Sequence, residues 1–338
     1  MVHRFFASLS VFALLMAVPL PGQTQRAPGA KTWTLSRTPD GQPDLQGVWT
    51  NATLTPLERG VVMAITGERI TLPGATSLTV TDQEAREFEK RIQEGNSFDR
   101  RDGSADADVS RAYNNLFIDR GTEFARVDGS KRTSLIIDPP EGKIPPLTPE
   151  TLRKAAARPV NLFDSAQDRP LGERCIVGFG SAGGPPMLPV GYNSNAQIIQ
   201  SPGYVMILVE MVHDVRIIRL GGTHAPPNVR QWLGDSVGHW EGDTLVVDTT
   251  NFTDKTRFRG SSENLHVTER FKRVDAGTIL YRATIEDPTA FTRAWTLEYP
   301  FVASPNPTYE YACHEGNYAM AGILGGARKA DLEAESKK

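Results

Sequence analysis

Side chains that could take part in chemistry are densest in the segment GHWEGDTLVVDTTNF, residues 238–252. Glu241 and Asp243 stand two positions apart, so their carboxylates point to the same face of an extended chain. A glycine on each side of the His-Trp-Glu triplet permits a bend or bulge. The segment is therefore either a β-hairpin capped by Trp240, or one wall of a site in which carboxylates do acid–base work.

A second candidate is the segment ENLHVTERFKRV, in which residues alternate between the two faces of a predicted strand. His266 and Arg270 share one face, whereas Glu269 lies among apolar residues on the other. Burial among apolar groups raises the pKa of a carboxyl, and this is one way to make a general acid. The alternative is a structural Glu269 that pairs with an arginine such as Arg216 or Arg273.

Apart from His3, the histidines all lie in the C-terminal half of the chain. The neighbours His213 and Asp214 would point to opposite faces of a strand, so adjacency alone does not make them a catalytic dyad. The arginines of these segments could hold an anionic group, and Trp240 could provide a stacking face. The predicted catalytic residues are His213, Glu241, His266 and Glu269, and the predicted substrate-binding residues are Arg216, His224, Trp240, Asp243, Arg270, His314 and Asn317.

No cofactor is predicted from sequence motifs. A divalent metal on converging histidines and carboxylates is the alternative, but the chain contains no HExxH, H-x-H or paired-cysteine spacing. GDSVG, residues 234–238, matches Gly-x-Ser-x-Gly, but it precedes a predicted strand, whereas a nucleophile elbow lies between a strand and a helix. A phosphate loop and a dinucleotide fingerprint are also missing from the sequence.

The elements that must position these residues are mainly β. From Tyr192 to Cys313, runs rich in Val, Ile, Tyr, Phe and Thr follow one another, separated by turn residues. This rhythm predicts an antiparallel barrel or sandwich, to which a strand after Asp44 is added. The lack of strand–helix alternation argues against a parallel α/β sheet.

The N-terminal half is expected to contribute helical and loop insertions. Its clearest helix is predicted over residues 81–95, where Thr81 or Asp82 can cap the start and Gly95 ends the pattern. We predict a signal peptide over 1–30, a linker over 31–43, one β-rich domain over 44–325 with its insertion at about 81–189, and a polar tail over 326–338.

The N-terminus has the layout of a secretory signal, with a basic start at Arg4 and an apolar run that is short for a membrane span. A membrane anchor is the alternative. We therefore predict a periplasmic or secreted protein, in which Cys175 and Cys313 form a disulfide rather than remaining two unpaired thiols. The net charge of −3 gives no electrostatic footprint for nucleic acid, and no membrane contact is expected once the signal is removed.

Several segments together resemble a large, mostly uncharacterised family of secreted bacterial proteins. They are LQGVWTN, GERC, EMVHDVRII, GDSVGHWEGDTLVVDTTNF, ENLHVTERFKRV, TIEDPTAFTRAW and YACHEGN. The resemblance implies export and a shared fold more than a reaction. Gly47-Val48-Trp49 also resembles the Gly-x-Trp motif of calycin-like β-barrels, although the N-terminal helices and long insertions depart from their compact form.

These observations lead to two hypotheses of function. The first is an exported hydrolase or lyase that acts by acid–base chemistry on an extracellular glycan, glycoside or other small molecule. The second is a non-catalytic β-barrel that binds a small apolar or sugar ligand, and a structural envelope protein is a third possibility. A shallow cleft with converging His, Glu and Arg would favour the enzyme, and a deep apolar cavity would favour the binding protein.

Overall fold

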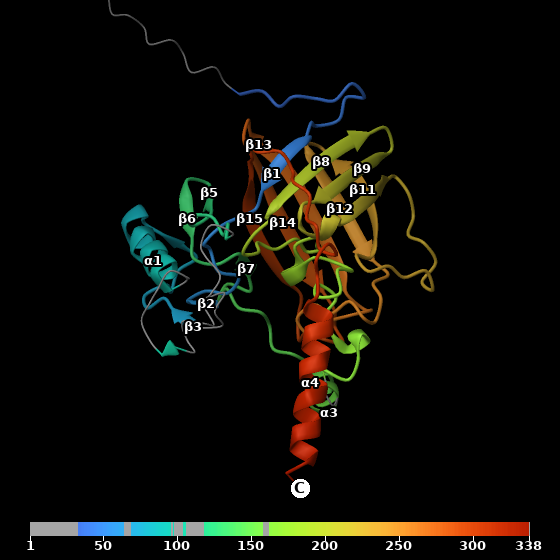
Figure 1. Cartoon of the computed structure of the whole chain (residues 1–338). Coiled ribbons are helices and arrows are strands. Elements are labelled where there is room, and N and C mark those ends of the chain that lie inside the picture. Colours follow the sequence, from blue (N-terminus) through green and yellow to red (C-terminus); the bar gives the residue numbers. More distant parts are fainter. Residues whose placement is uncertain are drawn as a thin grey trace, which may run out of the picture. The chain divides into compact units, whose positions relative to one another are not determined.

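The computed structural model of the chain describes residues 33–63, 69–95, 97, 104–105, 118–157 and 162–337, with only the backbone at position 213 (Figure 1). The predicted signal peptide lies outside these residues. Thr34–Lys338 form one compact unit.

Nine strands make a closed barrel, because β1 pairs with β8 on one side and with β15 on the other. The mainly β prediction is confirmed, and the barrel rather than the sandwich is formed. The strands are β1 (Gly47–Thr50), β8 (Asn195–Ser201), β9 (Tyr204–Val209), β10 (Val215–Leu220), β11 (Asp235–Glu241), β12 (Thr244–Thr250), β13 (His266–Asp275), β14 (Thr278–Glu286) and β15 (Trp295–Ala303).

One pair of barrel strands departs from the predicted antiparallel pattern. β10 and β11 run parallel, with Ile218 opposite Ser236. The connection between them, residues 221–234, is long enough to return the chain to the end of the barrel at which β10 begins, which a tight turn cannot do. The other neighbouring pairs of the barrel are antiparallel.

Large inward side chains fill the barrel. Phe271, Tyr281 and Phe301 are at most 1 % exposed, and the ring centroids of Tyr281 and Phe301 lie 4.9 Å apart. Trp49 and Trp295 are buried in the same core. Aromatic side chains bury the most apolar area per residue, so this interior is a packed core rather than a ligand cavity.

A buried ion pair crosses this aromatic core. Arg216 of β10 donates from Nη1 to Oε1 of Glu269 at 3.0 Å and from Nη2 to Oε2, and both side chains are almost completely buried. Tyr281 donates its hydroxyl to the same Oε1 at 2.8 Å. Glu269 therefore has the structural role considered above, as the partner of Arg216.

The glycine- and proline-rich segment before β8 covers this core. The amide of Met187 donates to the Tyr281 hydroxyl at 2.9 Å, and its carbonyl accepts from the Tyr299 hydroxyl at 3.0 Å. Both tyrosines face inward, so the segment is held across the barrel interior by hydrogen bonds to the core. A void of about 10 Å³ remains beneath it, room for roughly one water molecule.

Outside the barrel, the described residues of the N-terminal half contain short strands and two helices. Helix α1 (Asp82–Gly95) has a capping box, in which Thr81 N donates to Oε2 of Glu84 at 2.9 Å and Glu84 N donates to Oγ1 of Thr81 at 3.3 Å. This confirms the helix predicted over 81–95. The other elements are β2 (Val61–Met63), β3 (Arg69–Thr71), β4 (Thr79–Val80), β5 (Arg126–Val127), β6 (Ser130–Arg132), β7 (Ile136–Asp138), α3 (Pro149–Ala157) and 3-10 turns at Ala166–Asp168, Phe179–Ser181 and Met211–His213.

The C-terminal segment, predicted as a polar tail, is mostly helical. Helix α4 (Ala319–Glu335) continues through most of residues 326–338, because Ala, Leu, Lys and Glu there are good helix formers. Among the described residues, every helix is too short or too polar to span a bilayer.

The buried ion pair gives a direct test of what holds the barrel. We expect Glu269→Gln to lower the free energy of unfolding by about 3–5 kcal/mol, because it leaves the Arg216 charge buried without compensation. Urea unfolding measures the loss, and the control is Glu241→Gln on the surface, which should change stability little. Replacing both partners by Met should recover part of the loss. Equal stability of Glu269→Gln and the control would contradict this role.

Candidate functional site

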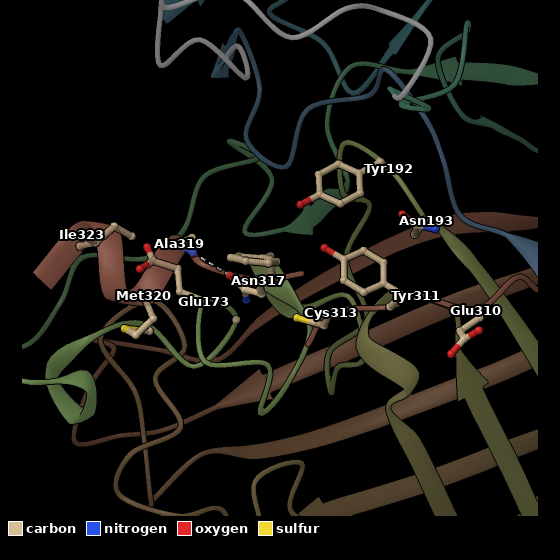
Figure 2. A pocket seen from close by; sticks show the side chains of 13 residues that line it. Glu173, Tyr192, Asn193, Glu310, Tyr311, Cys313, Asn317, Ala319, Met320 and Ile323 are labelled. Carbon is tan, nitrogen blue, oxygen red and sulfur yellow. Dashed lines mark hydrogen bonds between the residues drawn. The ribbon is translucent and has the colours of Figure 1, made fainter. Parts of the chain in front are cut away.

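A pocket of about 510 Å³ lies outside the barrel, near the end where β8 begins and β9 ends (Figure 2). Two stretches far apart in the sequence form it, residues 172–193 and 310–323, so no single sequence motif marks it. The lining residues are Gly172, Glu173, Phe179, Tyr192, Asn193, Glu310, Tyr311, Ala312, Cys313, Asn317, Ala319, Met320 and Ile323.

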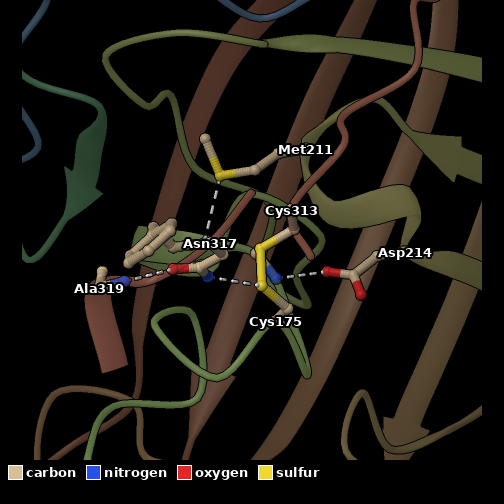
Figure 3. The surroundings of a disulfide bond; sticks show 8 residues. Cys175, Met211, Asp214, Cys313, Asn317 and Ala319 are labelled. Carbon is tan, nitrogen blue, oxygen red and sulfur yellow. Dashed lines mark hydrogen bonds between the residues drawn. A yellow bond between two sulfur atoms is a disulfide. The ribbon is translucent and has the colours of Figure 1, made fainter. Parts of the chain in front are cut away.

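The predicted disulfide is confirmed, and it holds two of these segments together (Figure 3). Cys175 and Cys313 are 138 positions apart in sequence, with their Cα atoms 5.8 Å apart. Asn317 donates from Nδ2 to Sγ of Cys175 at 3.7 Å and accepts at Oδ1 from the amide of Ala319 at 3.1 Å. The bridge therefore fixes both the wall of the pocket and the start of α4.

The loop after Cys175 is also fastened to the barrel. Gly178 N donates to Oδ2 of Asp214 at 2.7 Å, and Phe179 N contacts Sδ of Met211 at 3.2 Å (Figure 3). Both partners follow the end of β9. The pocket wall is thus attached to a rigid scaffold, which favours a preformed binding geometry.

Aromatic and apolar side chains face each other across the pocket. The rings of Tyr192 and Tyr311 are stacked, with centroids 6.4 Å apart and planes 11° apart. In Figure 2 they lie on one side, and Met320 and Ile323 of α4 lie on the other. Such a lining suits a ligand with an apolar or ring-shaped part.

Carboxylates supply the charge of the pocket. Glu173 accepts from Arg169 at 2.7 and 2.9 Å, so its charge is compensated. Glu310 is exposed. Behind the wall, the buried Glu210 accepts from Nδ2 of Asn193 at 2.8 Å, and its other partners among the described residues are the side chain of Asn195 and a backbone amide.

Two of the predicted histidines meet on the outer face of the barrel instead. Oδ1 and Oδ2 of Asp248 lie 2.7 Å from Nε2 of His224 and 2.6 Å from Nε2 of His266, respectively. The hydrogen bond to Asp248 raises the pKa of His266, and the bond to His266 lowers the pKa of Asp248. His266 Nδ1 also lies 3.3 Å from Glu286.

A neighbouring carboxylate anchors the same cluster. Asp235 is buried and accepts from Arg219 at 2.8 Å and 3.0 Å, and its Oδ2 lies 3.0 Å from Nδ1 of His224. The hydrogen bonds from Arg219 and from the Ala225 amide, with that to His224, lower the pKa of Asp235 to about 2. The cluster sits on the barrel surface and contributes no residue to the pocket.

The residues at the end of the β11–β12 hairpin form surface ion pairs. Arg270 donates to Oε2 of Glu241 at 2.7 Å, which lowers the pKa of Glu241, and Arg37 donates to Asp243 at 2.7 Å. Trp240 faces inward and packs against the core. Residues 238–252 therefore match the first of the two interpretations above, a β-hairpin capped by Trp240.

The predicted site residues therefore do not form one cleft. Arg216 and Glu269 are inside the barrel, Asn317 lines the pocket, and His314 is exposed beside the disulfide. The side chain of His213 lies outside the described part of the structure. Within that part, no group of three or more His, Cys, Asp or Glu is arranged to hold a metal ion.

Sequence reasoning missed the aromatic wall of the pocket. The sequence places Tyr192 and Tyr311 in the stretch of predicted strands, and no motif marks Phe179. The available signal was the predicted disulfide, because it brings the segments around Cys175 and Cys313 together.

The histidine cluster predicts a pH dependence of stability. The pKa of His266 is raised above its ordinary 6.5 in the folded protein. The stabilisation that protonated His266 gives the fold is therefore complete below about pH 6.5 and is lost as pH rises through the folded-state pKa. We expect His266→Gln to abolish this loss. Urea unfolding from pH 5.5 to 9 measures it, with His239→Gln on the surface as the control. Parallel curves for the wild type and His266→Gln would contradict the assignment.

The disulfide predicts a coupled loss of stability and pocket structure. Replacing both Cys175 and Cys313 by Ala should lower the free energy of unfolding by about 4–5 kcal/mol in the chain-entropy model. Amide hydrogen exchange should accelerate most over residues 310–317, which the bridge holds. Lower stability with unchanged exchange in that segment would show that the pocket does not depend on the bridge.

Comparison with known proteins leaves the family open. No protein-family profile matches the chain, and no curated protein matches it. Among solved structures, a mutant of the fluorescent protein UnaG is similar over 40% of this chain and 86% of its own, with 15% sequence identity and a TM-score of 0.22.

Proposed function

We propose that the protein binds a small organic molecule in the pocket beside the Cys175–Cys313 disulfide, without catalysis. The observation that supports this most is the pocket of about 510 Å³ with its stacked Tyr192 and Tyr311. Its volume falls in the range of sites that enclose small ligands, roughly 300–1,000 Å³. The ligand is a compact molecule with an apolar or ring-shaped part, and a sugar ring meets this description.

The packed core directs the ligand to the outside of the barrel. The interior holds the Arg216–Glu269 pair and its aromatic neighbours, and the segment around Met187 covers them. Entry of a ligand there would break buried hydrogen bonds without replacing them, which costs free energy. The pocket outside requires no such loss.

Export is part of the proposal. The signal-like layout of residues 1–30 and the disulfide both support a periplasmic or secreted location. Membership of the secreted bacterial family with the GDSxGxWEGDTLVV block is proposed on the same segments that suggested it.

A second candidate function is acid–base cleavage of a glycan, glycoside or other small molecule at the outer-face cluster, by hydrolysis or by the elimination that a lyase catalyses. It is favoured by Asp248, which lies between His224 and His266 and raises the pKa of His266. A carboxylate that orients an imidazole is a common arrangement for proton transfer. The open surface offers less substrate contact than the pocket, so binding is the preferred proposal.

The binding proposal is tested with a panel of sugars, aryl glycosides, phenolic esters and ammonium compounds. We expect at least one compound to raise the melting temperature without product formation. Tyr311→Ala should weaken its binding by about tenfold, because an aromatic contact is lost. Calorimetric titration measures the affinity.

The matched control is Tyr309→Ala, which removes an exposed tyrosine outside the pocket lining two positions away. It should leave the affinity unchanged. Equal losses in both variants, or no binding by any compound, would overturn the proposal. Turnover that His266→Gln abolishes would instead support the enzyme.

A further inference from the structure

The charged side chains that line the pocket are negative. Its lining holds the carboxylates of Glu173 and Glu310 and, within the described residues, no lysine, arginine or histidine. Arg169 compensates Glu173 from outside the lining. Glu310 has no ion-pair partner in the part of the chain that the structure describes, so its negative charge remains for a ligand.

A further carboxylate behind the wall adds to this potential. Glu210 is 5 % exposed, and the donors that reach it from Asn193, Asn195 and the Tyr309 amide are neutral. Neutral donors stabilise a carboxylate without cancelling its charge. Asn193 also lines the pocket, so the charge of Glu210 lies one side chain away from it.

The aromatic wall favours the same kind of ligand. The face of an aromatic ring carries negative electrostatic potential and attracts a cation that lies over it. Tyr192, Tyr311 and Phe179 all contribute to the lining, and Tyr192 and Tyr311 are stacked on one side of it. Aromatic faces combined with an uncompensated carboxylate are the recognition chemistry of an ammonium group.

From this combination we infer that the pocket selects organic cations, namely small molecules with a protonated or quaternary ammonium group. This inference rests on the proposed binding function and specifies its ligand class. The ammonium group lies against Tyr192, Tyr311 and Glu310, and the apolar part of the ligand lies toward Met320 and Ile323 of α4. A neutral sugar would leave the charge of Glu310 unused.

Three probes of nearly the same shape separate charge from size. Choline is the cation, 3,3-dimethylbutan-1-ol is its neutral carbon analogue, and 3,3-dimethylbutanoate is an anion of similar size. We expect the full mature chain, with its disulfide intact, to bind choline about tenfold more tightly than the alcohol, and the anion most weakly. Calorimetry and ligand-observed NMR measure the three affinities.

A pair of variants locates the charge. Glu310→Gln should weaken choline binding about threefold or more and leave the affinity for the alcohol unchanged. Glu315→Gln is the control, because Glu315 is an exposed carboxylate on the same segment outside the lining. Both positions are exposed, so the variants should keep the melting temperature of the wild type.

The outcomes separate this inference from the proposed function. If the alcohol or the anion binds as tightly as choline, cation selectivity is wrong while the binding function stands. If all three probes fail to bind but a neutral compound of the broader panel binds, cation selectivity is again wrong and the binding function again stands. If no compound of either set binds, both proposals fall.

Discussion

The buried pair of Arg216 and Glu269 is the constraint on which the rest of the barrel depends. Two charges inside a protein are tolerated only when they meet with good geometry and when their remaining hydrogen-bonding capacity is satisfied. Glu269 meets this condition through Nη1 and Nη2 of Arg216 and the Tyr281 hydroxyl, whereas the buried Nε of Arg216 has no hydrogen-bond partner among the described residues. Tyr281 in turn accepts from the Met187 amide, so the covering segment is bound to the same network. The described side chains fill the barrel interior in this way, so the proposed binding site lies outside it.

The disulfide stabilises the loops that form the pocket outside the filled barrel. A pocket outside the barrel has to be built from loops, and loops lose more conformational entropy when they are ordered than strands that are already paired. The Cys175–Cys313 bridge removes part of that freedom in advance, and the hydrogen bonds of Asp214 and Asn317 fix the two sides of the bridge. The site therefore combines loop residues with the rigidity of the barrel end.

Local patterns predicted the local structure well. The alternation of ENLHVTERFKRV is the alternation of β13, and Thr81 with Glu84 makes the capping box of α1. Closure of the barrel depends on contacts between the distant strands β1 and β15, and the parallel pairing of β10 with β11 depends on the path of the connection between them. Periodicity encodes neither. The sequence predicted that Glu269 lies on the apolar face of its strand. It left Arg216 and Arg273 as alternative ion-pair partners, and the three-dimensional structure shows that the partner is Arg216. Tyr192 and Tyr311 could not be predicted as pocket residues for the same reason, because they line the pocket only when two distant stretches of the chain meet.

The histidines illustrate how a chemically suggestive cluster can follow from topology. His224 lies in the long connection that makes β10 and β11 parallel, and its two ring nitrogens contact Asp235 of β11 and Asp248 of β12. The amide of Ala225 donates to Asp235 as well, so the returning chain is attached to the strands that it leads to. A long connection needs such attachment, because otherwise its ordering entropy opposes the crossover. The imidazoles and carboxylates that suggested acid–base chemistry in the sequence thus have a structural reason to lie together, and the pocket needs none of them.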